Sequence, residues 1–278
     1  MMLQTARLFL FLLSFFSMQV CSETKTHEAV KFAVFPYFSE QQMQDIYLPV
    51  AEQLSAKLGV KVVFHTAASH RQFIHELNNE SYEIVLVPPF WYPVAVDQKN
   101  YLPKLKMSEP FRSLVLVPED SPIQQIEDLR NQVIATPPKF VPVVTLVIKA
   151  LAQNGLVPGR DLTLMSNETV EQCFQKVVQS SAVACVAPPF TPDYFEENRQ
   201  IKFRTVMESE GIPGVALIVH QRVELARRNA IYLFFRDLDQ TRHGRELLSK
   251  MKTQKFVPIE KGEYDSVRKL LHKSRAYH

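Results

Sequence analysis

The sequence lacks most of the motifs that mark an enzyme, a metalloprotein or a nucleic-acid-binding protein. Only 7 of its 278 residues are glycine, and it has no glycine-rich phosphate loop, zinc signature or nucleophile elbow. Of its 8 histidines only His65, His70 and His75 are close in sequence, and a spacing of five residues does not place them on one helical face. The formal net charge of +3 gives no reason to expect nucleic acid. We therefore expect no metal, no cofactor and no nucleic-acid partner.

Long apolar runs are confined to the amino terminus. Arg7 precedes an apolar stretch, residues 8–16, that is too short to span a bilayer, and the modest side chains of Val20 and Ser22 suit cleavage directly after Ser22. This pattern predicts a signal peptide over residues 1–22 and export to the periplasm of a bacterium. The remainder is long enough for one large domain or for two lobes, either with an ample core.

Cysteine is scarce, with 3 residues in the chain. Lipoprotein anchoring at Cys21 is not expected, because Val20 is a poor fit to the small residue that such processing prefers. Cys173 lies on the apolar face of an expected helix and Cys185 in the strand that follows, so we expect a disulfide between them, stabilising the fold by roughly 3 kcal/mol. The alternative is two buried free thiols. A catalytic thiol is not favoured, because neither cysteine has a histidine nearby in sequence.

Proline is plentiful, with 18 residues, and it recurs in one pattern. Three β-branched apolar runs stop at two consecutive prolines with a phenylalanine just behind them: residues 85–89 with Phe90, 133–138 with Phe140, and 182–189 with Phe190. A Pro-Pro pair cannot continue a central strand, and ligands of open α/β sheets bind at the carboxyl ends of strands. The pattern predicts a small-molecule cleft with an aromatic lining. The alternative is that each copy only ends a buried strand and places its phenylalanine in the core.

Strand and helix patterns alternate along the chain, which predicts an α/β fold with parallel strands covered on both faces. The expected strands are residues 31–36, 60–66 and 84–87 in a first series, and 114–117, 132–136, 162–165 and 182–186 in a second. Residues 109–111 and 211–214 are the expected hinge crossings between two lobes. Lobe 1 is then residues 23–111 plus 207–278 and lobe 2 is residues 112–206, and the lobes are expected to close around a ligand.

Six phrases of the sequence together resemble one known family. They are FPY at 35–37, YLPVAEQL at 47–54, ASH at 68–70, YEIVLVPP at 82–89 followed by Tyr92, FRSLVLV at 111–117 and LAQNGL at 151–156. With these phrases, over nearly all of the mature chain, the sequence resembles the periplasmic substrate-binding proteins of phosphate, phosphite and phosphonate ABC transporters.

The resemblance implies a two-lobed periplasmic-binding-protein fold of the Venus-flytrap kind, type II, with two hinge crossings. It implies a protein with no chemistry of its own that captures a small-molecule solute and passes it to an ABC permease. Family members line their cleft at the positions of Tyr37, Tyr92, Arg112 and Ser113, so these residues are expected to bind the ligand.

The chain departs from the family where an oxyanion would bind. In place of a typical Ser-Thr-Ser-Gly-His run at the start of a helix it has the residues FVPVV at 140–144, and Pro188 and Pro189 stand where an acidic position suits an amine-bearing ligand. Hydroxyls, amides and the helix dipole hold such an anion, each charge-assisted bond contributing roughly 1.5–3 kcal/mol. We therefore do not expect a simple phosphonate. Lys139 would restore one positive charge unless it is a solvated surface lysine.

Further candidates surround the three proline turns. Trp91, between Phe90 and Tyr92, is either a stacking wall for a ligand or a packed helix start. His70 either donates to a ligand or caps a surface helix. The remaining candidates are hydroxyls or aromatic walls near the turns: Thr136, Thr191, Phe140 and Phe190.

Three functions compete. The leading one is a monomeric, non-enzymatic solute receptor that feeds an ABC permease or presents its ligand to a membrane sensor. An enzyme on the same bilobal fold, a lyase or a transferase, is the main rival, because a fold does not fix a function. Few paired acids and bases lie near the strand ends, with Asp193 the nearest carboxylate, which counts against it. The third is a protein-interaction module with a vestigial cleft.

Overall fold

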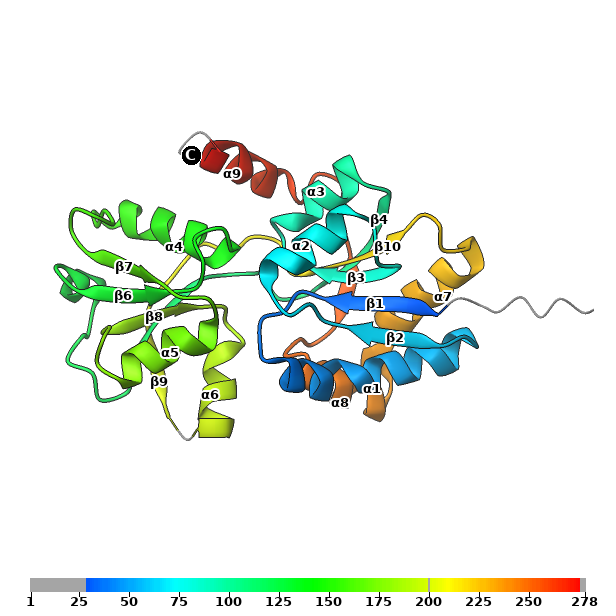
Figure 1. The fold of residues 1–278 in the computed structure, drawn as a ribbon, viewed down its shortest axis with the longest axis horizontal. Helices are drawn as coiled ribbons and strands as arrows, with labels where there is room; N and C mark the ends of the chain where they lie inside the picture. The colour runs from blue at the N-terminus through cyan, green and yellow to red at the C-terminus, as the bar shows by residue number, and fades with distance from the viewer. Residues whose placement is uncertain (1–28, 200, 276–278) are drawn as a thin grey trace, which may run out of the picture.

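The computed structural model describes residues 29–199 and 201–275. The predicted signal peptide, residues 1–22, and Cys21 lie outside these residues. The described chain forms two β-sheets with helices on both faces of each, which appear as two lobes in Figure 1. We call the elements around the six-stranded sheet the first lobe and those around the five-stranded sheet the second lobe.

The first lobe contains the strands β1 (Val30–Val34), β2 (Val62–His65), β3 (Ile84–Val87), β4 (Tyr101–Met107), β10 (Ala216–His220) and β11 (Phe256–Pro258) and the helices α1 (Glu40–Leu58), α2 (His70–Asn78), α3 (Trp91–Gln98), α7 (Leu225–Arg236), η2 (Leu238–Gln240), α8 (Arg242–Lys250) and α9 (Asp265–Arg275). The strand order is β11-β4-β10-β3-β1-β2. Strands β2 and β3 run parallel to β1, whereas β10 is antiparallel to β3 and β4. Helices α1, α7 and α8 lie on one face of this sheet and α2 and α3 on the other (Figure 1).

The second lobe contains the strands β5 (Leu114–Pro118), β6 (Val133–Thr136), β7 (Thr163–Ser166), β8 (Ala184–Ala187) and β9 (Phe203–Glu208) and the helices η1 (Ile126–Leu129), α4 (Pro142–Gln153), α5 (Val170–Val178) and α6 (Thr191–Arg199). Its order, β7-β6-β8-β5-β9, repeats the plan of the first lobe, because β7 and β8 run parallel to β6 and β5 is antiparallel to β8. The α/β alternation predicted from the sequence is therefore present in both lobes.

The chain passes between the sheets twice, from β4 to β5 and from β9 back to β10. The two passages pair with each other: Phe111 and Ile212 each donate a backbone N–H to the other's carbonyl, at 2.8 and 2.9 Å. Gly214 must be a glycine, since a Cβ there would lie 2.4 Å from the carbonyl oxygen of Met107. Two adjacent backbone segments thus connect the lobes, and both contain the predicted hinge residues.

Local sequence explains most element bounds. The backbone N–H of Ser39 donates to the Gln42 side chain at the start of α1, and Gly59 ends that helix at a φ of 64°. Pro142 occupies the first turn of α4, where its missing N–H costs no hydrogen bond. The alternation did not indicate β4, whose Pro103 is tolerated because the pairing with β10 is irregular beside Leu217 and Ile218.

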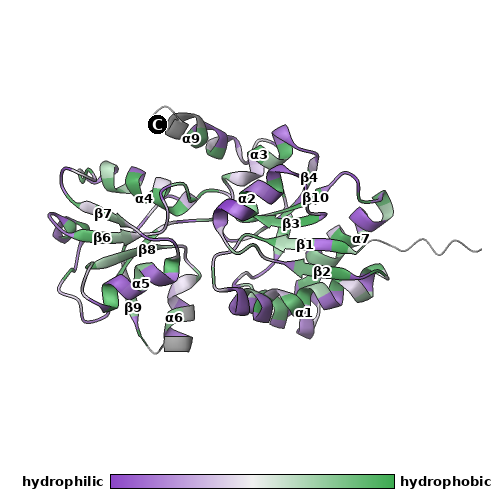
Figure 2. Ribbon diagram, viewed as in Figure 1, coloured by the Kyte–Doolittle hydropathy of each residue, from purple (hydrophilic) through white to green (hydrophobic). Residues whose placement is uncertain are grey.

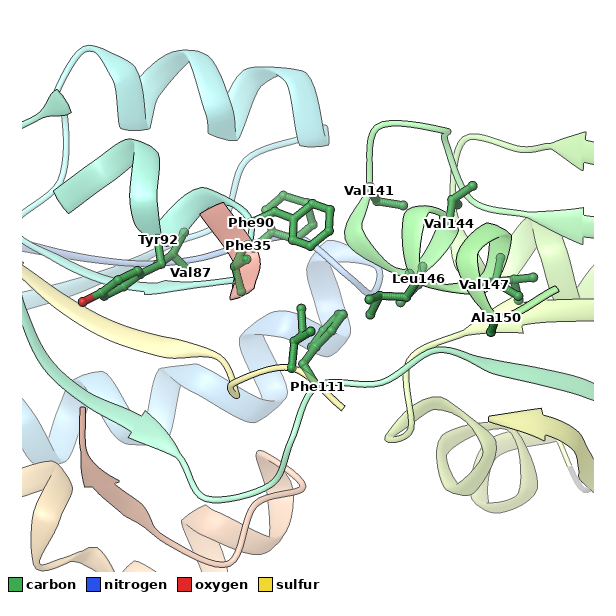
Figure 3. Packing of buried hydrophobic residues seen from close by; sticks show 14 of the residues in the cluster. Phe35, Val87, Phe90, Tyr92, Phe111, Val141, Val144, Leu146, Val147 and Ala150 are labelled. Atoms are coloured by element: carbon green, nitrogen blue, oxygen red, sulfur yellow. The ribbon is translucent and has the colours of Figure 1, made fainter. Parts of the chain in front are cut away.

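Most of the buried side chains are apolar. Figure 2 shows mainly hydrophobic residues in the strands, whereas the helices mix hydrophobic and hydrophilic residues. One buried apolar cluster extends from the first lobe into the second, and Figure 3 shows it from Phe35 and Phe90, past Phe111 at the crossing, to Val141, just before α4, and Val144 within it. Within the described part of the chain, no helix combines the length and apolar character needed to cross a bilayer.

Candidate functional site

A cavity of about 220 Å³ lies between the two lobes. Its walls come from the carboxyl ends of β1, β3, β6 and β8, from the first turns of α4 and α6, and from both passages between the sheets. The side chains that line it are largely apolar: Val34, Phe35, Leu86, Pro88, Met107, Pro110, Phe111, Pro137, Val141, Pro142, Val143, Val170, Pro188, Pro189, Phe190, Val215 and Met251. Its place at the carboxyl ends of parallel strands is where α/β proteins bind ligands.

The three Pro-Pro turns meet at this cavity. Strands β3, β6 and β8 each end at the residue directly before a proline pair, as the sequence predicts. The first proline of each pair, Pro88, Pro137 or Pro188, belongs to the lining. These turns provide stiff apolar walls and no backbone N–H groups at the proline positions.

The phenylalanines behind the prolines have different environments. Phe190 lines the cavity, and its ring centre lies 4.8 Å from that of Tyr37 in the other lobe. Phe140 is outside the lining, but its ring centre lies 6.1 Å from that of His70, again across the gap. Phe90 is only 4% exposed and packs in the buried cluster. The core alternative therefore describes Phe90, whereas the two second-lobe rings face the first lobe.

Two tyrosines provide the hydroxyl groups of the lining. The oxygens of Tyr37 and Tyr47 lie 2.8 Å apart in a hydrogen bond. Burial raises the pKa of Tyr47, although its bond to Tyr37 acts in the opposite direction. Burial and the neighbouring Tyr47 also raise the pKa of Tyr37. Both phenols are therefore neutral near pH 7.

His70 begins α2 at the edge of the cavity, where it stacks on Phe35 with ring centres 4.7 Å apart. Burial lowers the pKa of His70, and a backbone bond at Pro36 and the charge of Glu168 oppose this only in part. The imidazole is therefore neutral near pH 7 and offers one donor and one acceptor. Because Ser69 accepts the Gln72 N–H, it is Ser69 and not His70 that caps this helix.

Three side chains of the lining carry charge: Glu109, Asp193 and Lys252. The ammonium of Lys252, after α8, lies 3.0 Å from Glu197 and 3.9 Å from Asp193, both on α6 of the other lobe. Burial tends to raise the pKa of Glu109, but hydrogen bonds from Thr253, Gln254 and Ser108 outweigh it and hold the pKa below its ordinary value. The walls thus combine apolar surface with two carboxylates and one paired ammonium.

Two other aromatic candidates lie away from the cavity. Tyr92 is 5% exposed and stacks on Tyr264 with ring centres 3.9 Å apart. Trp91 is the first residue of α3 and packs against the buried cluster, and its buried Nε1 has no hydrogen-bond partner. Neither residue lines the cavity, so the packed helix start is the arrangement found for Trp91.

The polar candidates are also outside the lining. Arg112 is paired with Glu208 at 3.2 Å, and the buried Ser113 donates its backbone N–H to the Ser209 hydroxyl. Lys139 is exposed at the surface.

The two threonines of this group are buried and satisfied locally. The hydroxyl of Thr136 donates to the Pro137 carbonyl and that of Thr191 to the Pro188 carbonyl, at 2.9 and 2.6 Å. Both bonds therefore stabilise the proline turns on the side away from the cavity lining. Of the predicted residues, Tyr37, His70 and Phe190 are the ones that meet at the cavity.

Sequence reasoning missed several lining residues. Phe35 lies in one of the family-like phrases and could have been found there. Met251 and Lys252 follow α8, late in the chain, and reach the site only because the chain returns to the first lobe after β9. The sequence indicates Glu109 only as a hinge residue, because Thr253 and Gln254, which donate hydrogen bonds to it, are distant in sequence.

The predicted disulfide between Cys173 and Cys185 is absent from the structure. Cys173 on α5 and Cys185 on β8 are both buried free thiols. Their sulfurs lie 3.9 and 3.7 Å from the same carbonyl oxygen, that of Val186. Burial, followed by the neighbouring Cys173, raises the pKa of Cys185. Apolar packing between helix and strand therefore joins the two elements without a covalent bond.

Among the described residues, no group of three or more His, Cys, Asp and Glu side chains is arranged to hold a metal ion.

Comparisons with known proteins agree with the geometry. The family model for the periplasmic substrate-binding protein of phosphonate ABC transporters matches residues 32–264. No curated protein matches the chain in sequence.

Solved structures share the fold at low sequence identity. The binding protein component of an ABC phosphonate transporter from Pseudomonas aeruginosa superposes with a TM-score of 0.74 at 17% identity, covering 89% of this chain and 87% of the other. The PhnD1 protein of Prochlorococcus marinus, solved with methylphosphonate, gives 0.77 at 12% identity, covering 89% and 98%. A Xanthomonas citri protein solved with ATP gives 0.62 at 15%, covering 87% and 96%. The type II periplasmic-binding-protein fold predicted from the sequence is thereby confirmed. The chain belongs to the family of periplasmic substrate-binding proteins of phosphonate ABC transporters.

Proposed function

We propose that the cavity binds a compact, largely apolar solute that is not an oxyanion, and that the protein acts as a receptor without catalysis. The family consists of periplasmic receptors that bind small-molecule solutes for ABC permeases. Tyr37, His70 and Phe190 are the predicted residues that would touch the solute.

The observation that carries this proposal is the composition of the cavity walls. Prolines from three strand ends and rings from both lobes surround a space of about 220 Å³. In another protein an apolar cavity of roughly 150 Å³ holds benzene. A solute of about one ring in size therefore fits, with polar groups directed at Tyr37 and His70.

A phosphonate would find few partners here. At the start of α4, Pro142 has no N–H and the Val144 N–H is bonded to the Val141 carbonyl, so this helix end presents little of its usual donor set. The ammonium of Lys252 already faces two carboxylates. Methylphosphonate binding by PhnD1 therefore does not carry over to this chain at a shared fold and 12% identity.

The mature chain is expected to be a monomer in which the lobes close about the two passages, residues 108–113 and 209–215. A permease is the expected partner. A membrane sensor that reads the closed form would require the same cavity and the same closure.

A thermal-shift screen of the protein without residues 1–22 tests the proposal. Single-ring and branched apolar solutes should raise the melting temperature, since a ligand at a hundred times its Kd adds about 2.7 kcal/mol. Methylphosphonate and phosphate should have no effect on the melting temperature. A solute that binds should compact the protein in small-angle scattering and should not be converted to a product. Phe190→Ala should abolish the shift, while Leu225→Ala, at an exposed site, should retain it. Stabilisation by phosphonates at micromolar concentration would refute the proposal.

A further inference from the structure

The charges of the cavity wall point to the kind of solute that it accepts. Among the described lining residues, Glu109 and Asp193 are carboxylates and Lys252 carries the only ammonium. His70, Tyr37 and Tyr47 are neutral for the reasons given above. The wall therefore has a surplus of negative charge.

Glu109 holds its charge without a cation. Its carboxylate accepts hydrogen bonds from the Ser108 hydroxyl at 2.8 Å, the Gln254 backbone N–H at 2.9 Å and the Thr253 hydroxyl. No ion pair among the described residues includes it. A further bond from its own backbone N–H also holds the carboxylate in its charged form, so the charge faces the cavity without a compensating cation.

Lys252 does not neutralise this charge. Its ammonium lies between Glu197 and Asp193, and these two carboxylates outnumber it. An anionic solute would therefore meet repulsion on this side of the cavity as well as at Glu109.

The aromatic part of the lining suits a positive charge for an independent reason. Phe35, Tyr37, Phe111 and Phe190 all line the cavity and come from both lobes and from the first passage. The face of an aromatic ring attracts cations, and sites lined by several rings recognise ammonium ligands in this way.

We infer that the solute is a compact organic cation, a primary or quaternary ammonium with an apolar body, whose charge is held by the ring faces and by Glu109. This inference rests on the proposed function and adds the sign of the charge to it. The apolar body would lie against the three proline turns.

Matched pairs of probes separate charge from shape. Choline and 3,3-dimethylbutan-1-ol have nearly the same shape, as do benzylammonium and benzyl alcohol, and only the first of each pair is charged. Calorimetry on the protein without residues 1–22 should give at least about tenfold tighter binding for the charged member of one pair or both. Raising the salt concentration should reduce this preference.

Substitutions locate the charge. Glu109→Gln replaces the carboxylate by a neutral amide of similar shape and should weaken cation binding about tenfold while leaving the neutral probe within about twofold. Glu208→Gln is the matched control, because Glu208 lies at the second passage but pairs with Arg112 outside the lining. Asp193 is 66% exposed and takes no part in the hydrogen bonds to Glu109. Asp193→Asn should therefore weaken cation binding to a smaller extent.

The outcomes distinguish this inference from the proposed function. If the neutral members bind as tightly as the cations, or if only neutral apolar solutes bind, the inference is wrong and the proposed function stands. If methylphosphonate binds more tightly than all four probes, both are wrong. If no apolar solute of either charge binds, the proposed function fails and the inference fails with it.

Discussion

The phenylalanine of the first lobe's Pro-Pro turn is buried in the apolar cluster, whereas both phenylalanines of the second lobe's turns face the first lobe across the gap. Phe90 is buried, while Phe190 contacts Tyr37 and Phe140 contacts His70 across the gap. The same pattern, two prolines followed within two residues by a phenylalanine, thus ends a strand in each case, but the ring is buried in the first lobe and faces the first lobe from the second.

The residues that follow the turn differ between Phe90 and Phe190. Helix α3 continues with Tyr92, Pro93 and Ala95, which are all buried, so its start must pack against its own sheet. Helix α6 continues with acidic residues, and Asp193 and Glu197 are exposed. The prolines end the strand in each case, but the next helical turn alone does not fix the ring, since Phe140 faces His70 although Val143 and Val144 behind it are buried.

Alanine substitutions of Phe90 and Phe190 should differ most in their effect on the free energy of unfolding. Phe90→Ala removes a fully packed ring and should lower the free energy of unfolding by about 3–5 kcal/mol. Phe190→Ala removes a partly exposed ring and should cost roughly 1–2 kcal/mol. Urea denaturation followed by circular dichroism measures both. Equal losses would mean that the two rings have the same structural role.

The cysteines of the second lobe provide the next largest effect. Cys185→Ser places a hydroxyl in a buried apolar site and should destabilise the protein by about 1–3 kcal/mol. With free thiols, dithiothreitol should leave the melting temperature unchanged, whereas a bridge across a loop of this size would contribute roughly 3 kcal/mol. The thiols should react with a chromogenic disulfide reagent only after unfolding, because burial raises the pKa of Cys185. Loss of stability on reduction would reinstate the disulfide.

Sequence patterns predicted strand ends and helix starts well where the signal is local. The run that ends at Pro88 and Pro89 marks both a strand end and a cavity wall, and Pro142 marks the start of α4. The ring positions could not be predicted in the same way. Whether Phe90 or Phe190 faces the cavity depends on packing against other elements, which a single short phrase does not contain.

The sequence did not predict contacts between residues from distant parts of the chain. Lys252 reaches Glu197 only because the chain returns to the first sheet after β9, and Glu109 meets Thr253 for the same reason. Arg112 and Tyr92 carry a family resemblance, yet an ion pair and a stacked ring hold them away from the lining. The family resemblance therefore predicted the fold correctly, but it did not predict which of these side chains line the cavity.

A smaller effect is expected from the ion pair that joins the lobes. Lys252 is 29% exposed, and its carboxylate partners are more exposed still, so Lys252→Met should change the free energy of unfolding by less than about 1 kcal/mol. Its main effect should be on the distance between the lobes, visible in small-angle scattering as an expansion, and high salt should reproduce it. Lys202→Met breaks a pair with Glu196 inside the second lobe and serves as the control. Expansion in the control alone would contradict this role for Lys252.

The smallest effect concerns pH and the ring pair of His70 and Phe140. Burial lowers the pKa of His70 in the folded protein, so the unfolded chain binds the proton more readily. Stability is then fully retained above the ordinary histidine pKa of about 6.5 and decreases as the pH falls below it.

His70→Gln should therefore remove part of the loss that the wild type shows between about pH 7.5 and 5.5. His243→Gln, at a side chain 56% exposed, should leave that loss unchanged. Because the second lobe contributes Phe140 and Glu168 to the surroundings of His70, opening the lobes should change the pKa of this imidazole. Histidine NMR titration of the wild type and of Lys252→Met measures it. If the pKa of His70 is the same in both, the second lobe plays no part in burying that ring.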